Sequence, residues 1–101
     1  MQLSTSDKEI LQHYFAELPV KRAYVFGSYA RHTAIKEFSD LDILVELDHT
    51  NPIGMNFFTY QSDLQTLMKR KVDLVSNEGI SRHIKPHIDQ EKILIYERIG
   101  G

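Results

Sequence analysis

Residues 39–47, Ser-Asp-Leu-Asp-Ile-Leu-Val-Glu-Leu, decide how this chain folds. Every second residue from Leu41 to Leu47 is aliphatic, and the positions between them are mostly acidic. Because side chains point alternately to the two faces of a strand, this pattern predicts a strand with one buried face. Aspartate is depleted in strands, yet Asp40 and Asp42 stand at the start of this one, on its other face. A break of the local rules of this kind indicates a functional site.

Before this strand the sequence predicts a helix, a second strand and a tight turn. Ser6-Asp7-Lys8-Glu9 has the Ser-x-x-Glu form of a capping box, and apolar residues then recur at helical spacing until Pro19. Residues 22–26, Arg-Ala-Tyr-Val-Phe, are aromatic and β-branched and predict a buried strand. Gly27-Ser28 ends that strand, and residues 29–31 are expected to open a short helix.

After residue 47 the pattern continues to alternate between helix and strand. Residues 48–52 have turn chemistry. From Phe57 to Met68 apolar side chains then repeat at helical spacing and predict a helix that ends in the basic Lys69-Arg70-Lys71. Residues 71–75, Lys-Val-Asp-Leu-Val, predict another short strand. One or two short helices are expected after residue 80, with a boundary that Pro86 leaves open, before an extended segment at residues 93–96. This order predicts an α/β (α+β) fold, a small mixed sheet covered by helices, in a single domain spanning residues 1–101.

The composition excludes several classes of function. Twelve Lys and Arg residues against 14 Asp and Glu residues give a formal net charge of −2, so the chain as a whole does not attract a polyanion and direct nucleic-acid binding is not expected. The absence of cysteine excludes disulfides, thiolate nucleophiles and zinc–thiolate sites. With neither a signal-peptide pattern nor a membrane-spanning run in the sequence, we expect a cytoplasmic protein.

Three aspartates predict a metal site. Asp40 and Asp42 project from one face of the same strand, and Asp73 lies in the strand predicted at residues 71–75. Where these two strands are neighbours, at the usual spacing of about 4.8 Å, the three carboxylates surround one point. Like charges so close raise one another's pKa unless a cation neutralises them. Mg²⁺ suits such open carboxylates, because it completes its coordination with water and phosphate oxygens. Glu46 shares the same face but stays outside the predicted ligands.

A phosphate-binding turn is predicted beside the metal site. Gly27-Ser28 stands at the end of a strand and before a short helix, where backbone N–H groups, the helix dipole and the Ser28 hydroxyl can hold phosphate oxygens. Arg31 follows on that short helix and can neutralise a phosphate group. Metal and phosphate sites side by side indicate nucleotide chemistry, which requires mainly positioning and charge neutralisation.

These motifs together carry a family resemblance. Gly27-Ser28-Tyr29-Ala30-Arg31, Ser39-Asp40-Leu41-Asp42-Ile43-Leu44-Val45 and Val72-Asp73-Leu74-Val75 resemble the minimal nucleotidyltransferases, or MNT-domain proteins, of the DNA polymerase beta superfamily. The resemblance covers nearly the whole chain and implies a polymerase beta-like nucleotidyltransferase fold. It implies that Asp40 and Asp42 bind both of two Mg²⁺ ions, and that Asp73 binds the catalytic ion and helps to activate the attacking hydroxyl. It also implies that Gly27 and Ser28 hold the nucleoside triphosphate.

Two positions depart from the pattern of that family. The residue after Arg31, commonly glycine, is His32, and the spacing from Gly-Ser to the first aspartate is one residue longer than is common. Neither departure touches a predicted metal ligand. Both affect the path of the loop from His32 to Ser39.

The resemblance also implies a partner. Larger members of the superfamily carry an extra domain for the acceptor, and 101 residues leave no room for one, so we expect another chain to supply the acceptor. Short MNT proteins are typically antitoxins paired with a HEPN-domain ribonuclease toxin. The resemblance therefore implies a Mg²⁺-dependent protein adenylyltransferase that transfers AMP from ATP to a tyrosine of the toxin, within a hetero-oligomer.

Two other functions stay open from the residues alone. The chain could neutralise its toxin by stoichiometric binding, without catalysis. It could also be the nucleotidyltransferase subunit of an enzyme that modifies a small molecule, with a partner subunit completing the pocket.

Overall fold

Four strands and three α-helices form the described part of the chain, residues 2–35, 38–48 and 57–99 of a computed structural model. Their order is α1 (Thr5–Ala16), β1 (Val20–Phe26), the 3₁₀ turn η1 (Gly27–Tyr29), β2 (Leu41–Leu47), α2 (Phe57–Met68), β3 (Val72–Ser76), α3 (Lys85–Glu91) and β4 (Ile93–Glu97). The strands form one sheet in the order β3-β2-β1-β4. Strands β2 and β3 are parallel, whereas β1 is antiparallel to both β2 and β4. The predicted small mixed sheet is confirmed.

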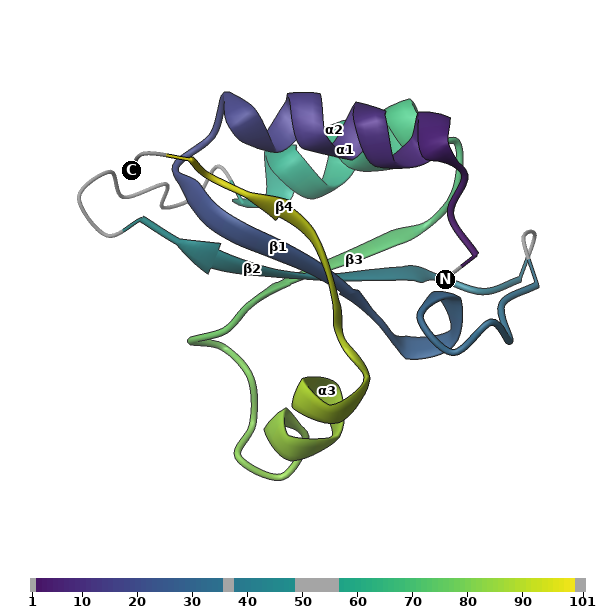
Figure 1. Ribbon diagram of the computed structural model, residues 1–101, viewed down its shortest axis with the longest axis vertical. Helices are drawn as coiled ribbons and strands as arrows, with labels where there is room; N and C mark the ends of the chain where they lie inside the picture. Colours follow the sequence, from purple (N-terminus) through teal and green to yellow (C-terminus); the bar gives the residue numbers. More distant parts are fainter. Residues whose placement is uncertain (1, 36–37, 49–56, 100–101) are drawn as a thin grey trace.

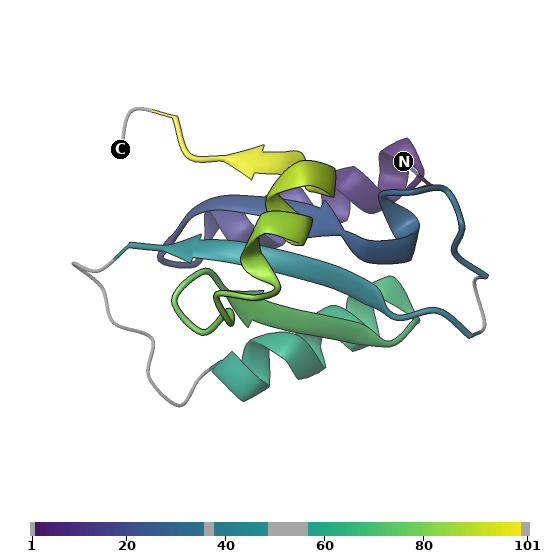
Figure 2. The same cartoon turned by 90° about the horizontal axis from the view of Figure 1, so that it is seen from below.

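The helices cover the two faces of the sheet unequally. Helices α1 and α2 lie side by side on one face, and the short α3 lies on the other (Figure 1). From the side of α3 the four strands are seen in their order, with α3 crossing the middle of the sheet (Figure 2). None of the helices in the described ranges has the length and apolar character needed to cross a bilayer.

The main core lies between the sheet and the pair α1 and α2. Leu11 and Phe15 of α1 and Leu64 of α2 have no exposed surface. They belong to one cluster with the aliphatic residues that face them from the sheet, among them Ala23, Val25, Leu41, Ile43, Val45 and Val72. The alternation from Leu41 to Leu47 therefore buries the predicted face of β2, as expected for a sheet packed on helices.

The other face of β2 is less polar than the sequence predicts. Leu44 is only 2% exposed, although it lies on the face of Asp42 and Glu46. Helix α3 covers this face and has Ile88 as its buried residue. The prediction of a single buried face was wrong because the sequence pattern of residues 80–92 did not show where that helix would lie.

Helix α1 begins earlier than predicted. Its capping box is formed by Ser4 and Asp7, not by Ser6 and Glu9: the Asp7 N–H donates to Ser4 Oγ at 3.0 Å, and the Ser4 N–H donates to Asp7 Oδ2 at 3.3 Å. The earlier start lets the preceding Leu3 reach the core, where it is 6% exposed. The strand predicted at residues 41–47 has the bounds expected. The helix predicted from residue 57 ends at Met68, before the basic residues 69–71 in which it was expected to end, because Lys69 takes a left-handed φ of 55°.

The remaining predicted elements differ by a few residues. The predicted strands at residues 22–26, 71–75 and 93–96 are found at residues 20–26, 72–76 and 93–97. Pro86 occupies the first turn of α3, where its missing N–H costs nothing. Of the turn predicted at residues 48–52, only Asp48 lies within the described residues.

Candidate functional site

Strand register brings three strands together at one end of the sheet. Asp42 pairs with Phe26, the last residue of β1, and on its other side with Asp73 of β3. Gly27 follows Phe26 directly, and Asp40 lies two residues before Asp42 on the same face. The predicted site residues Gly27, Ser28, Arg31, Asp40, Asp42 and Asp73 all come from segments that meet at this end.

The three aspartates form a cluster of carboxylates around Asp42. Asp40 and Asp73 are exposed, whereas Asp42 is partly buried. Burial, followed by the negative charges of Asp73, Asp40 and Glu91, raises the pKa of Asp42 from 3.8 to about 6, and only the charge of Arg31 lowers it. None of the three carboxylates has a hydrogen bond or ion pair with another residue of the described ranges. The cluster thus accumulates negative charge without a protein cation bound to it.

The donor set fits a divalent cation only together with a second ligand. In the described ranges no group of three His, Cys, Asp or Glu side chains is arranged to hold a metal ion by itself. Carboxylates with no cation between them repel one another, and Mg²⁺ commonly takes only one or two carboxylates and fills its remaining positions with phosphate oxygens and water. Unpaired aspartates beside a phosphate-binding turn therefore fit Mg²⁺ that arrives with a nucleotide. Their role as metal ligands stays a prediction.

The turn at Gly27 requires glycine for two reasons. Its φ of 71° lies in the left-handed region, which side chains other than glycine rarely adopt. A Cβ atom at this position would also collide with the carboxylate of Asp42, because its nearest neighbour would be Asp42 Oδ2. The backbone of Gly27 therefore approaches the aspartate cluster more closely than any other residue type permits.

The helix predicted after this turn is only one turn of 3₁₀ helix. It spans Gly27–Tyr29 and ends with the Arg31 N–H donating to the Gly27 carbonyl at 3.1 Å. So short an element has almost no macrodipole, so the helix-dipole contribution predicted for phosphate binding is absent here. The hydroxyl of Ser28 remains, and it makes no hydrogen bond with any other residue in the described ranges. Phosphate binding at this turn would depend on that hydroxyl, on backbone N–H groups and on Arg31.

The departure at His32 has a backbone explanation. His32 has a φ of 62°, in the left-handed region where glycine is most easily accommodated. The position at which the family commonly has glycine therefore requires this conformation here too. Histidine tolerates it better than most side chains, at a modest conformational cost.

Glu91 is a site residue that the sequence did not reveal. It ends α3, and Ile93, two residues later, pairs with Val25 near the end of β1. This register brings the Glu91 carboxylate beside the turn, where it accepts a hydrogen bond from the Gly27 N–H at 2.5 Å and from Arg31 Nη1 at 2.8 and 3.0 Å. A carboxylate at the C-terminal end of a helix is unfavourable in the field of the helix, and this was the available signal.

Glu46 is held by protein partners and is not free to bind a metal. It accepts hydrogen bonds from the hydroxyl of Tyr24 at 2.9 Å and from Arg22 Nη1 at 3.0 Å. Burial and the hydrogen bond to Glu46 raise the pKa of Tyr24 to about 12. Arg22 also pairs with Glu97 at 2.7 Å. Glu46 is therefore part of a polar network on the sheet.

Comparison with known proteins identifies close relatives of the chain. It is 39% identical to the Methanocaldococcus jannaschii protein named "Putative protein adenylyltransferase MJ1215". The match covers 79% of this chain and 95% of that protein. Its fold is similar to a chain in a toxin–antitoxin crystal structure with AMP-PNP, with a TM-score of 0.77 at 18% identity over 91% of this chain and 74% of that one. A chain in the structure of a tri-AMPylated Shewanella oneidensis HEPN toxin in complex with an MNT antitoxin gives a TM-score of 0.73 at 15% identity, over 95% of this chain and 74% of that one.

The family itself follows from the sequence match. The family described as "Polymerase beta, Nucleotidyltransferase" matches residues 8–99, which include the Gly27 turn, the three aspartates and Glu91. The two solved structures share the arrangement of helices and sheet of this chain, although their sequence identity to it is low. This chain belongs to the polymerase beta nucleotidyltransferase family.

Proposed function

We propose that this chain is a Mg²⁺-dependent protein adenylyltransferase that transfers AMP from ATP to a tyrosine hydroxyl of a HEPN-domain toxin, and so acts as its antitoxin. The observation that carries the proposal is the cluster of unpaired aspartates beside the glycine turn, at the end of the sheet where β1, β2 and β3 meet. The relative named as a protein adenylyltransferase, 39% identical, supports the transferred group. The structural neighbour that contains an AMPylated HEPN toxin supports the acceptor.

In the proposed reaction the acceptor oxygen forms a bond to the α-phosphorus of ATP. The bond from that phosphorus to the oxygen bridging to the β-phosphorus breaks, and pyrophosphate leaves with the electron pair of that bond. Asp73 is exposed at the edge of the sheet and is our candidate to accept the proton of the acceptor hydroxyl. Asp40, Asp42 and Asp73 would hold Mg²⁺, which when bound neutralises phosphate charge and lowers the pKa of the acceptor hydroxyl.

The residues around the turn orient the triphosphate in this scheme. Ser28 would donate its hydroxyl to a phosphate oxygen, and Arg31 would neutralise phosphate charge. Because Gly27 lies against Asp42, a nucleotide bound at the turn has its phosphates beside the aspartates. Positioning of this kind supplies much of the rate of phosphoryl-type transfer.

The proposed partner also accounts for the open form of the site. The aspartates lie at one end of the sheet, where Asp40 and Asp73 are both exposed to solvent. In the proposal a single domain provides the nucleotide half of the reaction centre, in the cytoplasm, and the toxin provides the acceptor half.

The test is transfer to a HEPN-domain protein, taken from a neighbouring gene where one is present. The two purified proteins are incubated with Mg²⁺ and ATP, and the toxin is measured by intact-protein mass spectrometry. We expect a mass increase of one or more AMP groups, lost with Asp42→Asn and retained with Asp89→Asn, a matched change on α3 at a carboxylate that pairs with Lys85 and Lys92. No mass increase with the wild-type pair would refute the catalytic proposal.

The binding alternative makes the opposite prediction for a double variant. Asp40→Asn with Asp42→Asn removes two predicted metal ligands and leaves the rest of the surface unchanged. If this variant still neutralises the toxin in cells, neutralisation is stoichiometric. If it forms the complex but no longer neutralises, catalysis is required.

A further inference from the structure

The carboxylate of Glu91 contacts both sides of the glycine turn. Its oxygen Oε2 accepts the Gly27 N–H at 2.5 Å, and both of its oxygens accept from Arg31 Nη1, at 2.8 and 3.0 Å. Its side chain is 23% exposed, against 54% for Arg31, so the carboxylate is the better shielded partner of the pair. One side chain of α3 thus connects the backbone of the turn with the cation that follows it.

The position of Glu91 is electrostatically unfavourable apart from these two contacts. It lies at the C-terminal end of α3, where the partial negative charge of the helix repels a carboxylate. It also lies near enough to Asp42 to raise the pKa of that carboxylate. The neighbouring cation Lys92 does not compensate it, because Lys92 pairs with Asp89 at 2.9 Å and lies over the ring of Tyr24 at 4.5 Å. The bonds to Gly27 and Arg31 therefore hold Glu91 against repulsion.

These contacts occupy the Gly27 N–H and one nitrogen of Arg31 but leave the other predicted phosphate-binding groups available. Glu91 uses only Nη1 of Arg31, while Nε and Nη2 make no hydrogen bond with any residue of the described ranges. The hydroxyl of Ser28 is likewise uncommitted there. A carboxylate that merely occupied the place of a phosphate would be expected to engage these uncommitted donors as well. Glu91 instead engages the Gly27 N–H and one edge of the guanidinium.

We propose that Glu91 is the positioning residue of the nucleotide site: its carboxylate fixes the Gly27 turn and the orientation of Arg31, so that Ser28 and the free edge of Arg31 are aligned for a triphosphate before it binds. This inference rests on the proposed function only for the identity of the ligand, a nucleoside triphosphate. It does not depend on the proposed acceptor. Alignment before binding lowers the ordering cost that a mobile arginine would add to nucleotide binding. Glu91 contacts no reacting atom and acts through Gly27 and Arg31.

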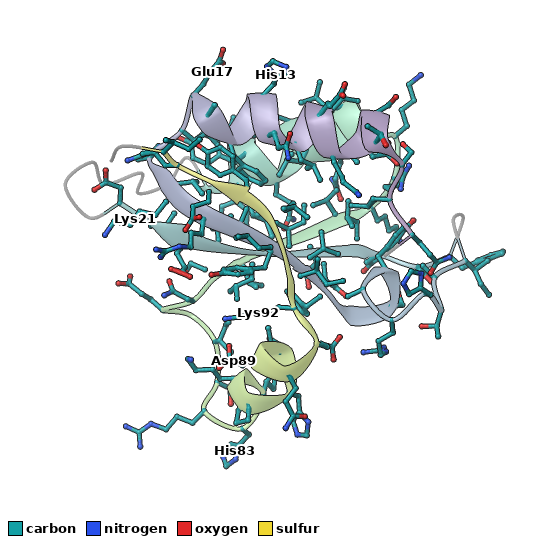
Figure 3. All side chains as sticks on the ribbon, viewed as in Figure 1. His13, Glu17, Lys21, His83, Asp89 and Lys92 are labelled. Atoms are coloured by element: carbon teal, nitrogen blue, oxygen red, sulfur yellow. The ribbon has the colours of Figure 1, made fainter. Side chains whose placement is uncertain are left out.

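The test compares Glu91→Gln with a matched control on the same helix. Glu91→Gln keeps an acceptor for the Gly27 N–H but removes the charge paired with Arg31, and Asp89→Asn makes the same change at a site paired with Lys85 and Lys92 (Figure 3). The dissociation constant of Mg²⁺-AMP-PNP is measured by calorimetry. We expect Glu91→Gln to weaken binding about tenfold, since hydrogen bonds to charged groups contribute more than neutral ones, and Asp89→Asn to leave it within about twofold.

Two further readouts separate positioning from a purely structural role. A structural Glu91 would lower the free energy of unfolding in urea and leave the dissociation constant of the folded protein unchanged. A positioning residue of the nucleotide site raises KM for ATP in Glu91→Gln while kcat at saturating ATP stays within about threefold of wild type, because the aspartates are intact.

The wild-type protein gives an answer that does not depend on a variant. An amide hydrogen-bonded to a carboxylate has a strongly downfield proton resonance, and we expect the Gly27 amide to keep this position when AMP-PNP is added. Loss of the downfield resonance on addition, or equal or tighter binding by Glu91→Gln, would show that Glu91 competes with phosphate and would overturn the inference. If wild-type protein binds no AMP-PNP, the proposed function fails, and this inference with it; if it binds and Glu91→Gln binds equally well, only the inference fails.

Discussion

Replacement of Asp42 by asparagine is predicted to stabilise the metal-free protein at neutral pH while it removes activity. The pKa of Asp42 is raised from 3.8 to about 6, first by burial and then by the charges of Asp73, Asp40 and Glu91. The difference of about 2.2, at about 1.4 kcal/mol for each pKa unit, means that the ionised carboxylate destabilises the folded state by at most about 3 kcal/mol. Because Asp42 is only partly buried, solvent screening reduces this to about 1–2 kcal/mol.

The sign of the effect depends on pH. Between about pH 4 and pH 6 the folded protein binds more protons at Asp42 than the unfolded chain does, so the contribution of Asp42 to stability falls as the pH rises. Urea unfolding in EDTA should therefore give Asp42→Asn a free energy of unfolding about 1–2 kcal/mol above wild type at pH 7.5. This advantage should shrink as the pH falls from 6 to 4 and approach zero below about pH 3, where the wild-type carboxyl is protonated in both states.

Asp89→Asn is the control for this experiment. The hydrogen bonds from Lys92 and Lys85 lower the pKa of Asp89, so its ionised form is favoured in the folded state and its removal should not raise stability at pH 7.5. An Asp42→Asn protein that is no more stable than wild type at pH 7.5 without metal would refute the reasoning. Repulsion among the aspartates would then not lower the free energy of unfolding.

Three further predictions concern the turn, the second face of the sheet and the metal. Gly27→Ala should lower the free energy of unfolding by about 2–3 kcal/mol in urea, because φ of 71° and the contact with Asp42 both oppose a Cβ atom. Leu44→Ala should lower it by about 2–4 kcal/mol in the same assay, since Leu44 is 2% exposed; a loss below about 1 kcal/mol would mean that α3 does not cover it. In thermal unfolding, Mg²⁺ with AMP-PNP should raise the Tm of wild type by several degrees and leave that of the Asp40→Asn/Asp42→Asn variant nearly unchanged, and an equal rise in both would exclude these aspartates as the ligands.

The sequence predicts those parts of the fold in which local pattern and tertiary packing agree. The strand at residues 41–47 has the bounds predicted because its period-two alternation matches a face buried on α1 and α2. The pairing of Asp42 with Asp73 follows once the two strands are neighbours and parallel. Parallel pairing could not be derived from either strand alone, because both present the same alternation in either direction.

Predictions fail where two local solutions are equally good. Ser4 with Asp7 and Ser6 with Glu9 both have capping-box spacing, and the helix begins at the first pair, directly after Leu3, which is buried in the core. The short helix after Gly27 is similar. Its residues are compatible with an α-helix, but the backbone ends after one 3₁₀ turn and takes the left-handed conformation at His32.

Glu91 shows what kind of information the sequence lacks. In sequence it is one acidic residue in a short helix, separated from Gly27 by 64 positions, and both it and Asp89 lie in the last turn of that helix. The two differ only through the sheet: Ile93 pairs with Val25 at the site end of β1, so the residue two before it reaches the glycine turn, whereas Asp89 pairs with lysines of its own segment. A carboxylate at the wrong end of a helix is thus a signal only when an unpaired donor lies within reach, and strand register decides which donor that is. The pairing of β2 with β3 places Asp73 beside Asp42, and the pairing of β1 with β4 places Glu91 beside Arg31. The predicted metal site and its proposed positioning residue are therefore both consequences of one arrangement of strands.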